Sequence, residues 1–244
     1  MRTGNPTLSE KSFRVEYAGT DAMTISGTVN KTAILLLLLT ITFMWSWKRV
    51  MAFGDMAAIF PWLIGSLILS IVFLLVTIFK KTASPISAPG YALAEGVLLG
   101  AISAVFELQY PGIVFQAVVL TFGTLFALLA AYRSGIIKAT ENFKLGVVAA
   151  TGGIALVYLM SFVMSFFGGG FGFIHDSGPI GIGFSVFVVI IAALNLVLDF
   201  DFIEAGAERG APKYMEWYGA FGLLVTLIWL YIEILRLLSK LQRR

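Results

Sequence analysis

Long apolar runs alternate with short polar segments along most of this chain. A helix needs about 20 apolar residues to cross a bilayer, and seven of the runs come close to that length. They cover residues 32–50, 57–79, 91–108, 113–132, 145–167, 180–203 and 214–238. The pattern predicts an all-α polytopic membrane protein with seven transmembrane helices.

The composition is typical of an integral membrane protein. Hydrophobic residues make up 59% of the 244 residues and charged residues only 13%, where soluble domains carry about 25%; the mean hydropathy is +0.91. We expect one transmembrane domain over residues 32–240, preceded by a flexible polar tail (1–31) and followed by a basic end (241–244). Cysteine is absent, which excludes disulfides, thiolate nucleophiles and Cys-based metal sites.

Basic residues predict the orientation of the spans, because Lys and Arg accumulate on the cytoplasmic side. With the N-terminus inside, 11 of the 17 Lys and Arg residues lie in inner segments. A cytoplasmic N-terminus in the cell membrane is therefore expected. The basic C-terminus then falls outside, unless the last helix only re-enters the membrane. The net charge of +3 reflects this topology and gives no indication of nucleic-acid binding.

The sixth span ends in "NLVLDFDFIEAGAERG", which places several carboxylates beside an apolar helix. Charged groups within a bilayer usually face a protein interior or a wet cavity. Asp199 shares a helix face with Asn195, four residues away, and is the strongest candidate for an ion- or proton-sensing group. Asp201 lies on a second acidic face, where the alternative is simply a solvated helix end. Because carboxylate oxygens are ligands for Ca²⁺, Asp199 and Asp201 are also candidate metal ligands.

A third candidate sensing group is Glu95, in "YALAEGVLLGAISAVFEL". Small residues recur every four positions there, and such a stripe lets another helix approach closely. Glu95 borders this stripe and is expected to point into the bundle. A purely structural carboxyl hydrogen-bonded to a neighbour is an equally good interpretation.

Candidates for a latch or gate lie on the last helix. Glu233 and Arg236 are three residues apart and can pair along one face. If the chain turns near residues 210–212, Asp199 lies level with residues 223–224, and Glu233 is about 15 Å farther along. Glu216 is nearer the turn. Helix geometry alone therefore assigns Asp199 no partner.

The only histidine, His175, lies in a glycine-rich loop between two spans and is best interpreted as solvated. The loop glycines do not follow a strand, so they do not indicate a dinucleotide or phosphate site.

Two stretches resemble the Bax inhibitor-1 family. They are "YALAEGVLLGAISAVFELQYPGIVFQAVVLTFGTLFALLAAYRSGIIKATENFK" and "LVLDFDFIE", and the similarity extends over about residues 22–240. Within that family, the sequence looks most like the bacterial branch often called Bax inhibitor-1/YccA-like. The resemblance implies a seven-helix fold with the last helix at its centre, and a pH-sensitive Ca²⁺ leak.

The resemblance also implies a proton-sensitive latch between aspartates on the last two helices, assisted by an earlier acid and a late arginine. Asp199 matches the penultimate-helix aspartate, and Glu95 the earlier acid. The last-helix position is ambiguous: one alignment places Glu233 there, whereas matching Arg236 to the late arginine leaves Thr226 in its place. The depth of Asp199 favours Thr226, and Asp201 could then share the work within one helix.

The sequence is compatible, to different degrees, with three classes of function. The leading hypothesis is a passive cation leak without a cofactor, in which Ca²⁺ is the transported ion and protons act on Asp199, Asp201 and Glu95. The alternative is a non-conducting regulator that binds a membrane protease or stress-response partner. An intramembrane hydrolase is disfavoured, because the Gly-x-Gly-Asp context of aspartyl enzymes is missing before Asp199. We therefore expect no enzymatic activity.

Overall fold

The computed structural model describes residues 22–53, 56–167, 171–172 and 176–243, and within these ranges it is all-helical. Seven long helices follow one another, each apolar and long enough to cross a membrane. They are α2 (Ile25–Phe53), α3 (Met56–Phe79), α4 (Ser84–Gln109), α5 (Ile113–Arg133), α6 (Glu141–Ser165), α7 (Pro179–Glu208) and α8 (Met215–Gln242), with a short 3-10 helix η2 (Lys81–Ala83) before α4. The predicted fold class is confirmed.

Several helices extend beyond the predicted apolar runs. Helix α2 begins at Ile25 rather than at residue 32, because Thr24 caps it: the Thr24 hydroxyl accepts a hydrogen bond from the Gly27 amide at 3.0 Å. Residues 25–31, expected to belong to the polar tail, are therefore helical, and residues 1–21 lie outside the described part. Helix α7 continues through Glu208, so the carboxylates after Asp199 are helical too. Hydropathy detects the lipid-compatible part of a helix and not its polar ends.

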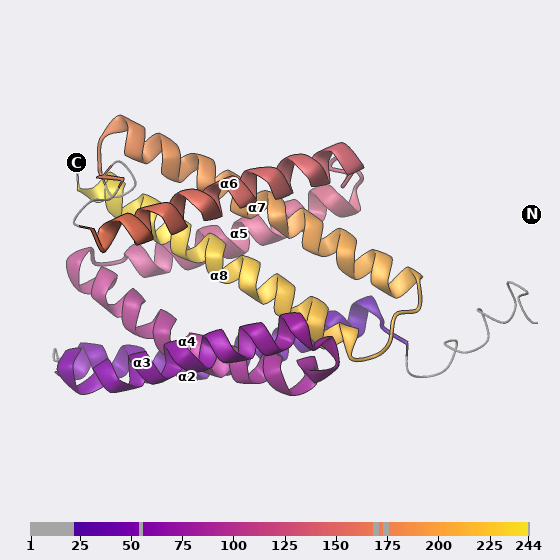
Figure 1. Ribbon diagram of the computed structural model, residues 1–244, viewed down its shortest axis with the longest axis horizontal. Coiled ribbons are helices and arrows are strands. Elements are labelled where there is room, and N and C mark those ends of the chain that lie inside the picture. Colours follow the sequence, from indigo (N-terminus) through magenta and orange to yellow (C-terminus); the bar gives the residue numbers. More distant parts are fainter. Residues whose placement is uncertain (1–21, 54–55, 168–170, 173–175, 244) are drawn as a thin grey trace, which may run out of the picture.

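Helix α8 occupies the centre of the bundle. It packs against α2, α4, α5 and α7, and it is the most buried of the seven. In Figure 1 it runs diagonally between a group formed by α2, α3 and α4 and a group formed by α5, α6 and α7. The expected central position of the last helix is confirmed.

Small residues allow α2 and α4 to pack closely. A methyl group added at Gly96 would lie 2.3 Å from the carbonyl oxygen of Leu39, and one added at Gly100 would lie 2.3 Å from that of Phe43. Both contacts involve backbone atoms of α2, which cannot move aside as a side chain can. The small-residue stripe predicted around Glu95 is thus a helix-packing surface.

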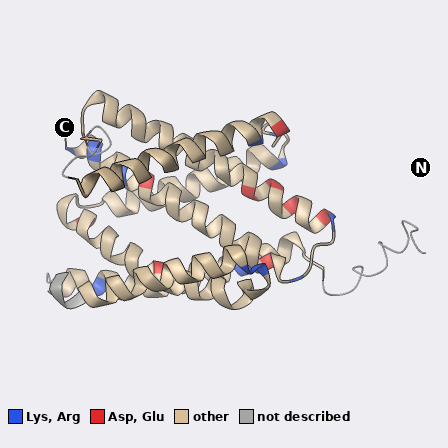
Figure 2. Ribbon diagram, in the orientation of Figure 1, with Lys and Arg blue, Asp and Glu red and all other residues tan. Residues whose placement is uncertain are grey.

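The two ends of α8 contact opposite ends of the bundle. Near its start, the Ser84 hydroxyl donates to the carbonyl of Tyr214 at 2.9 Å, and near its end Arg243 donates to the Tyr110 hydroxyl at 2.9 Å. Helix α8 therefore runs the full length of the bundle, from the level of the start of α4 to the level of its end. Charged residues lie mostly near the helix ends, as Figure 2 shows, with an acidic cluster at one end of α7.

Candidate functional site

Asp199 lies in the interface between α7 and α8. Its Oδ2 atom is enclosed by protein and has no hydrogen-bond partner. The carboxyl faces the hydroxyl of Thr226, and a methyl group added at Gly222 would lie 3.8 Å from Oδ1. The antiparallel pairing of α7 and α8 about the turn at Gly210 produces this register, close to the level expected from helix rise alone.

The residue opposite Asp199 on the last helix is thus Thr226, as the alignment through Arg236 implied. The Thr226 hydroxyl also donates to the Gly222 carbonyl one turn earlier, at 3.2 Å. A neutral hydroxyl therefore occupies the place where the family resemblance implies a second aspartate.

Glu233 belongs to a different cluster. Its buried carboxylate accepts hydrogen bonds from Arg236 at 2.9 and 3.0 Å and from the Tyr158 hydroxyl of α6 at 3.1 Å. Arg236 also donates to the Tyr158 oxygen at 2.8 Å. The predicted Glu233–Arg236 pair is confirmed, and it links α8 to α6.

Asp201 faces away from Asp199, towards α6. It forms an ion pair with Lys144 at 2.8 Å, while Glu204, one turn later, accepts a hydrogen bond from the Tyr132 hydroxyl of α5. Both acids line an open polar pocket of about 460 Å³ between the α5–α6 connection and α7. The structure therefore does not bring Asp199 and Asp201 into one ligand set, and no group of three or more metal-binding side chains occurs among the described residues.

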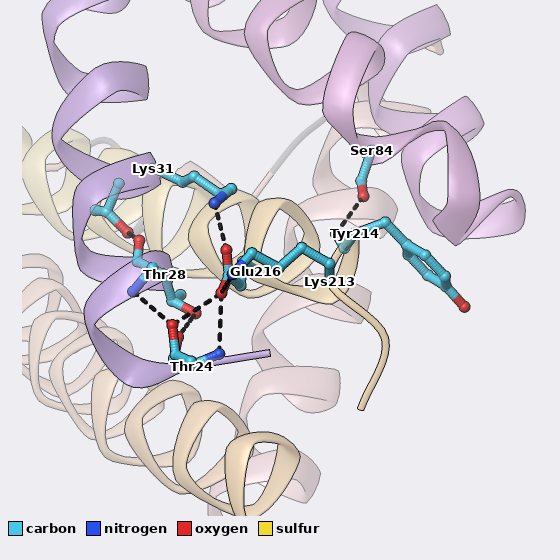
Figure 3. A network of polar contacts seen from close by, with 9 residues as sticks. Thr24, Thr28, Lys31, Ser84, Lys213, Tyr214 and Glu216 are labelled. Atoms are coloured by element: carbon cyan, nitrogen blue, oxygen red, sulfur yellow. Dashed lines mark hydrogen bonds and ion pairs between the residues drawn. The ribbon is translucent and has the colours of Figure 1, made fainter. Parts of the chain in front are cut away.

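Glu216 is fully buried at the start of α8 and holds the N-terminal end of α2. Its carboxylate accepts hydrogen bonds from the amide and hydroxyl of Thr24, both at 2.9 Å. It also pairs with Lys31, and with Lys213 at 3.3 Å. Figure 3 shows the carboxylate enclosed by these donors. Glu216 lies ten residues before Thr226 on α8, so it fastens one end of the central helix and does not contact Asp199.

Glu95 lies in the other half of the bundle. Its half-buried carboxyl faces the Ser70 hydroxyl of α3, but the Ser70 hydroxyl forms no hydrogen bond to any described residue. Among the described residues no hydrogen bond or ion pair joins Glu95 to Asp199. The sequence expectation that Glu95 points into the bundle holds, but the two acids are separate sites. His175 lies outside the described residues.

Three polar residues of α6 were missed by the sequence analysis. Lys144, Thr151 and Tyr158 each bind a side chain of α7 or α8: Asp201, Asn195 at 2.8 Å, and Glu233. Their spacing of seven residues within an apolar helix was visible in the sequence. It could not be distinguished from scattered interfacial residues until the partners on α7 and α8 were known.

Comparison with known proteins places this architecture in one family. The model of the Bax inhibitor 1 like family matches residues 5–243, which is nearly the whole chain. No curated protein and no solved structure matches significantly. Seven apolar helices around a central last helix, together with this match, identify the chain: it belongs to the Bax inhibitor 1 like family of membrane proteins, a family not known as enzymes.

Proposed function

We propose that this protein is a pH-sensitive passive leak pathway for cations, chiefly Ca²⁺, in the cytoplasmic membrane, with the N-terminus inside. Within the family, the resemblance of "LVLDFDFIE" favours the bacterial Bax inhibitor-1/YccA-like branch. Asp199 is the ion- and proton-sensing group of the pathway. Asp201, at the polar pocket, attracts cations to its mouth.

The enclosed Oδ2 of Asp199 is the observation that carries this proposal. A carboxyl group inside a membrane protein usually pairs with a cation or hydrogen-bond donors, since leaving it unpaired in a low-dielectric region is costly. Glu233 and Glu216 follow that rule, whereas Asp199 has a free oxygen. A carboxyl in this condition can take up a proton or a cation without first breaking an ion pair.

The neutral partner on α8 changes the mechanism that the family resemblance implies. With Thr226 opposite Asp199, no proton is shared between two carboxyls across α7 and α8. A change in the charge of Asp199 instead acts on one interface directly. Protonation and deprotonation then shift a closed–open equilibrium by altering how well Asp199 fits between the helices.

The test is Ca²⁺ flux into sealed proteoliposomes that contain an entrapped Ca²⁺ indicator, at a mildly acidic and a mildly alkaline pH. The parent protein is expected to conduct with a rate that differs between the two. Asp199→Asn is expected to flatten that difference, because the amide cannot titrate. Glu141→Gln is the matched control: it converts to an amide a carboxylate whose side chain is 91% exposed, so the pH difference should persist.

Two results would contradict the proposal. Vesicles with no Ca²⁺ flux at either pH would favour the alternative function, a non-conducting regulator that binds a membrane protease or stress-response partner. An unchanged pH profile in Asp199→Asn would remove this carboxyl from the sensing mechanism.

A further inference from the structure

Helix α6 presents one continuous stripe of residues to the bundle. Its members follow the alternating three- and four-residue spacing with which a helix keeps one face towards a neighbour. They are Lys144, Val147, Thr151, Ile154, Tyr158 and Ser161. Val147, Ile154 and Ser161 are buried. The other three members, Lys144, Thr151 and Tyr158, are polar and alternate with them along the stripe.

Each of these three polar residues meets a polar partner on the facing helices. Lys144 pairs with Asp201 at 2.8 Å, Thr151 accepts from Asn195 at 2.8 Å, and Tyr158 binds Glu233. Seven residues of helix rise about 10 Å. The three contacts therefore lie at successive depths along α6, and the first and last are roughly 20 Å apart along the helix axis.

Helix α8 continues the series towards its C-terminal end. Thr226, Glu233 and Lys240 are also seven residues apart, on one face. Buried Lys240 donates to the carbonyl of Gly181 at 3.0 Å and to the Ser185 hydroxyl at 2.8 Å, both on α7. On α7, Asp199 is one turn from Asn195, so the unpaired carboxyl belongs to the same line of polar groups.

The opposite side of α8 has a different character. There, α2, α4 and α5 border a crevice of about 220 Å³, lined almost entirely by apolar side chains. Helix α8 contributes Leu224, Leu227, Ile228 and Tyr231 to it, and the Tyr231 hydroxyl is hydrogen-bonded to the Ser103 hydroxyl at 2.6 Å. A cation moved into such surroundings would lose its hydration without gaining ligands. Among the described residues, carboxyl, amide and hydroxyl oxygens follow one another across the membrane on the side of α8 that faces α6 and α7.

Helix α6 is also the least firmly attached of the seven. Among the described helices it packs closely only with α7, and it has the smallest buried share. In Figure 1 it crosses α7 and α8 in the upper part of the view. A displacement of α6 therefore disturbs little apolar packing beyond its own stripe.

We infer that cations cross along the line where α6 meets α7 and α8, which we call the polar seam and define by Lys144, Asp201, Asp199, Asn195, Thr151, Tyr158, Glu233 and Lys240. This inference rests on the proposed leak function and names its route. The seam is closed in this structure between the Thr151 and Tyr158 levels, where Ile154 packs against Val188 and Ile191. Separation of α6 from α7 opens it, and the carboxyl and hydroxyl oxygens replace part of the water around the ion.

Cysteine accessibility tests the route, because the chain has no cysteine of its own. Thr151→Cys places a thiol in the polar seam. Thr121→Cys is the matched control: Thr121 is a buried threonine on α5 that lines the apolar crevice. Each variant is reconstituted and treated with a water-soluble methanethiosulfonate that carries a trimethylammonium group. Labelling is read by mass spectrometry and Ca²⁺ flux by the entrapped indicator.

The Thr151→Cys protein is expected to be labelled, with flux falling about tenfold or more, since the bulky adduct fills the seam and adds a positive charge that, unlike Lys144 beside Asp201, no carboxylate neutralises. Thr121→Cys should be neither labelled nor inhibited. Asn195→Cys repeats the test from the opposite wall of the polar seam, in case Thr151→Cys does not fold. Should the cysteine at 195 or 151 stay unlabelled, or be labelled without inhibition, while the parent conducts, the inferred route is wrong and the leak function stands. A parent that passes no Ca²⁺ instead contradicts the proposed function itself.

Discussion

Asp199 of α7 lies opposite Thr226 of α8, so an enclosed carboxyl faces a neutral hydroxyl across the interface between the last two helices. Neither residue is near the Glu233–Arg236 pair, which is engaged with Tyr158 of α6. The charged clusters of α8 therefore hold the bundle together, and among the described residues Asp199 is the carboxyl that has a fully enclosed oxygen without a hydrogen-bond partner. Substitutions in the two groups are therefore expected to have different effects: on stability for the clusters, and on flux for Asp199.

The first prediction concerns the hydroxyl beside Asp199. Thr226→Val keeps the shape of the side chain but removes its only polar atom. Asp199 then faces an apolar surface, so Ca²⁺ flux and its pH dependence should both change. Thr121→Val is the control, because the Thr121 hydroxyl donates only to the Ala117 carbonyl of its own helix at 2.7 Å. Equal flux changes in the two variants would show that Thr226 has no special relation to Asp199.

The second prediction concerns the attachment of α2 to α8. Glu216→Gln neutralises a carboxylate that pairs with Lys31 and Lys213. Because breaking a buried ion pair is costly, we expect a loss of about 2 kcal/mol or more in the free energy of unfolding. It should appear as a lower melting temperature in detergent. Glu141→Gln changes the same residue type at a site that is 91% exposed, and its melting temperature should equal that of the parent.

The third prediction concerns close packing between α2 and α4. Gly100→Ala introduces a methyl group 2.3 Å from the Phe43 carbonyl oxygen, which forces two backbones apart. We expect a clear drop in melting temperature. Gly123→Ala on α5 meets no atom within 4 Å; there, alanine should be neutral or stabilise the helix by up to about 1 kcal/mol. A tolerated alanine at 100 would mean that α2 and α4 are not in tight contact.

The fourth prediction concerns the attachment of α6. Tyr158→Phe deletes the hydroxyl that joins α6 to Glu233 and Arg236. Side-chain hydrogen bonds between membrane helices contribute about 0.6 to 2 kcal/mol, so stability should fall modestly. Hydrogen exchange should rise specifically in α6.

Tyr132→Phe provides the control for that experiment. It deletes a tyrosine–carboxylate hydrogen bond between α5 and α7, so any faster exchange should appear in those helices. Unchanged exchange in α6 of the Tyr158→Phe protein would argue that this helix is held by apolar contacts alone.

The fold was largely predictable, because a bilayer permits few solutions. A run of apolar residues must satisfy its backbone groups internally, and an α-helix does so within a single segment. The seven spans, the small-residue stripe at Gly96 and Gly100, and the depth of Asp199 relative to α8 all follow from composition and helix geometry. The helix ends did not follow, since the cap at Thr24 and the acids after Asp199 are polar.

The candidate site was predictable only residue by residue. Asp199 stands out because a carboxyl within an apolar run is costly to insert into a bilayer and usually faces the protein interior or a wet cavity. The residue that faces Asp199 depends on which faces of α7 and α8 pack together. The role of the polar residues spaced by seven on α6 becomes clear only from their contacts with Asn195, Asp201 and Glu233. A sequence prescribes which groups are costly to bury in lipid. Packing of the helices against one another decides which of those groups find partners and which, like the Asp199 carboxyl, keep an unpaired oxygen.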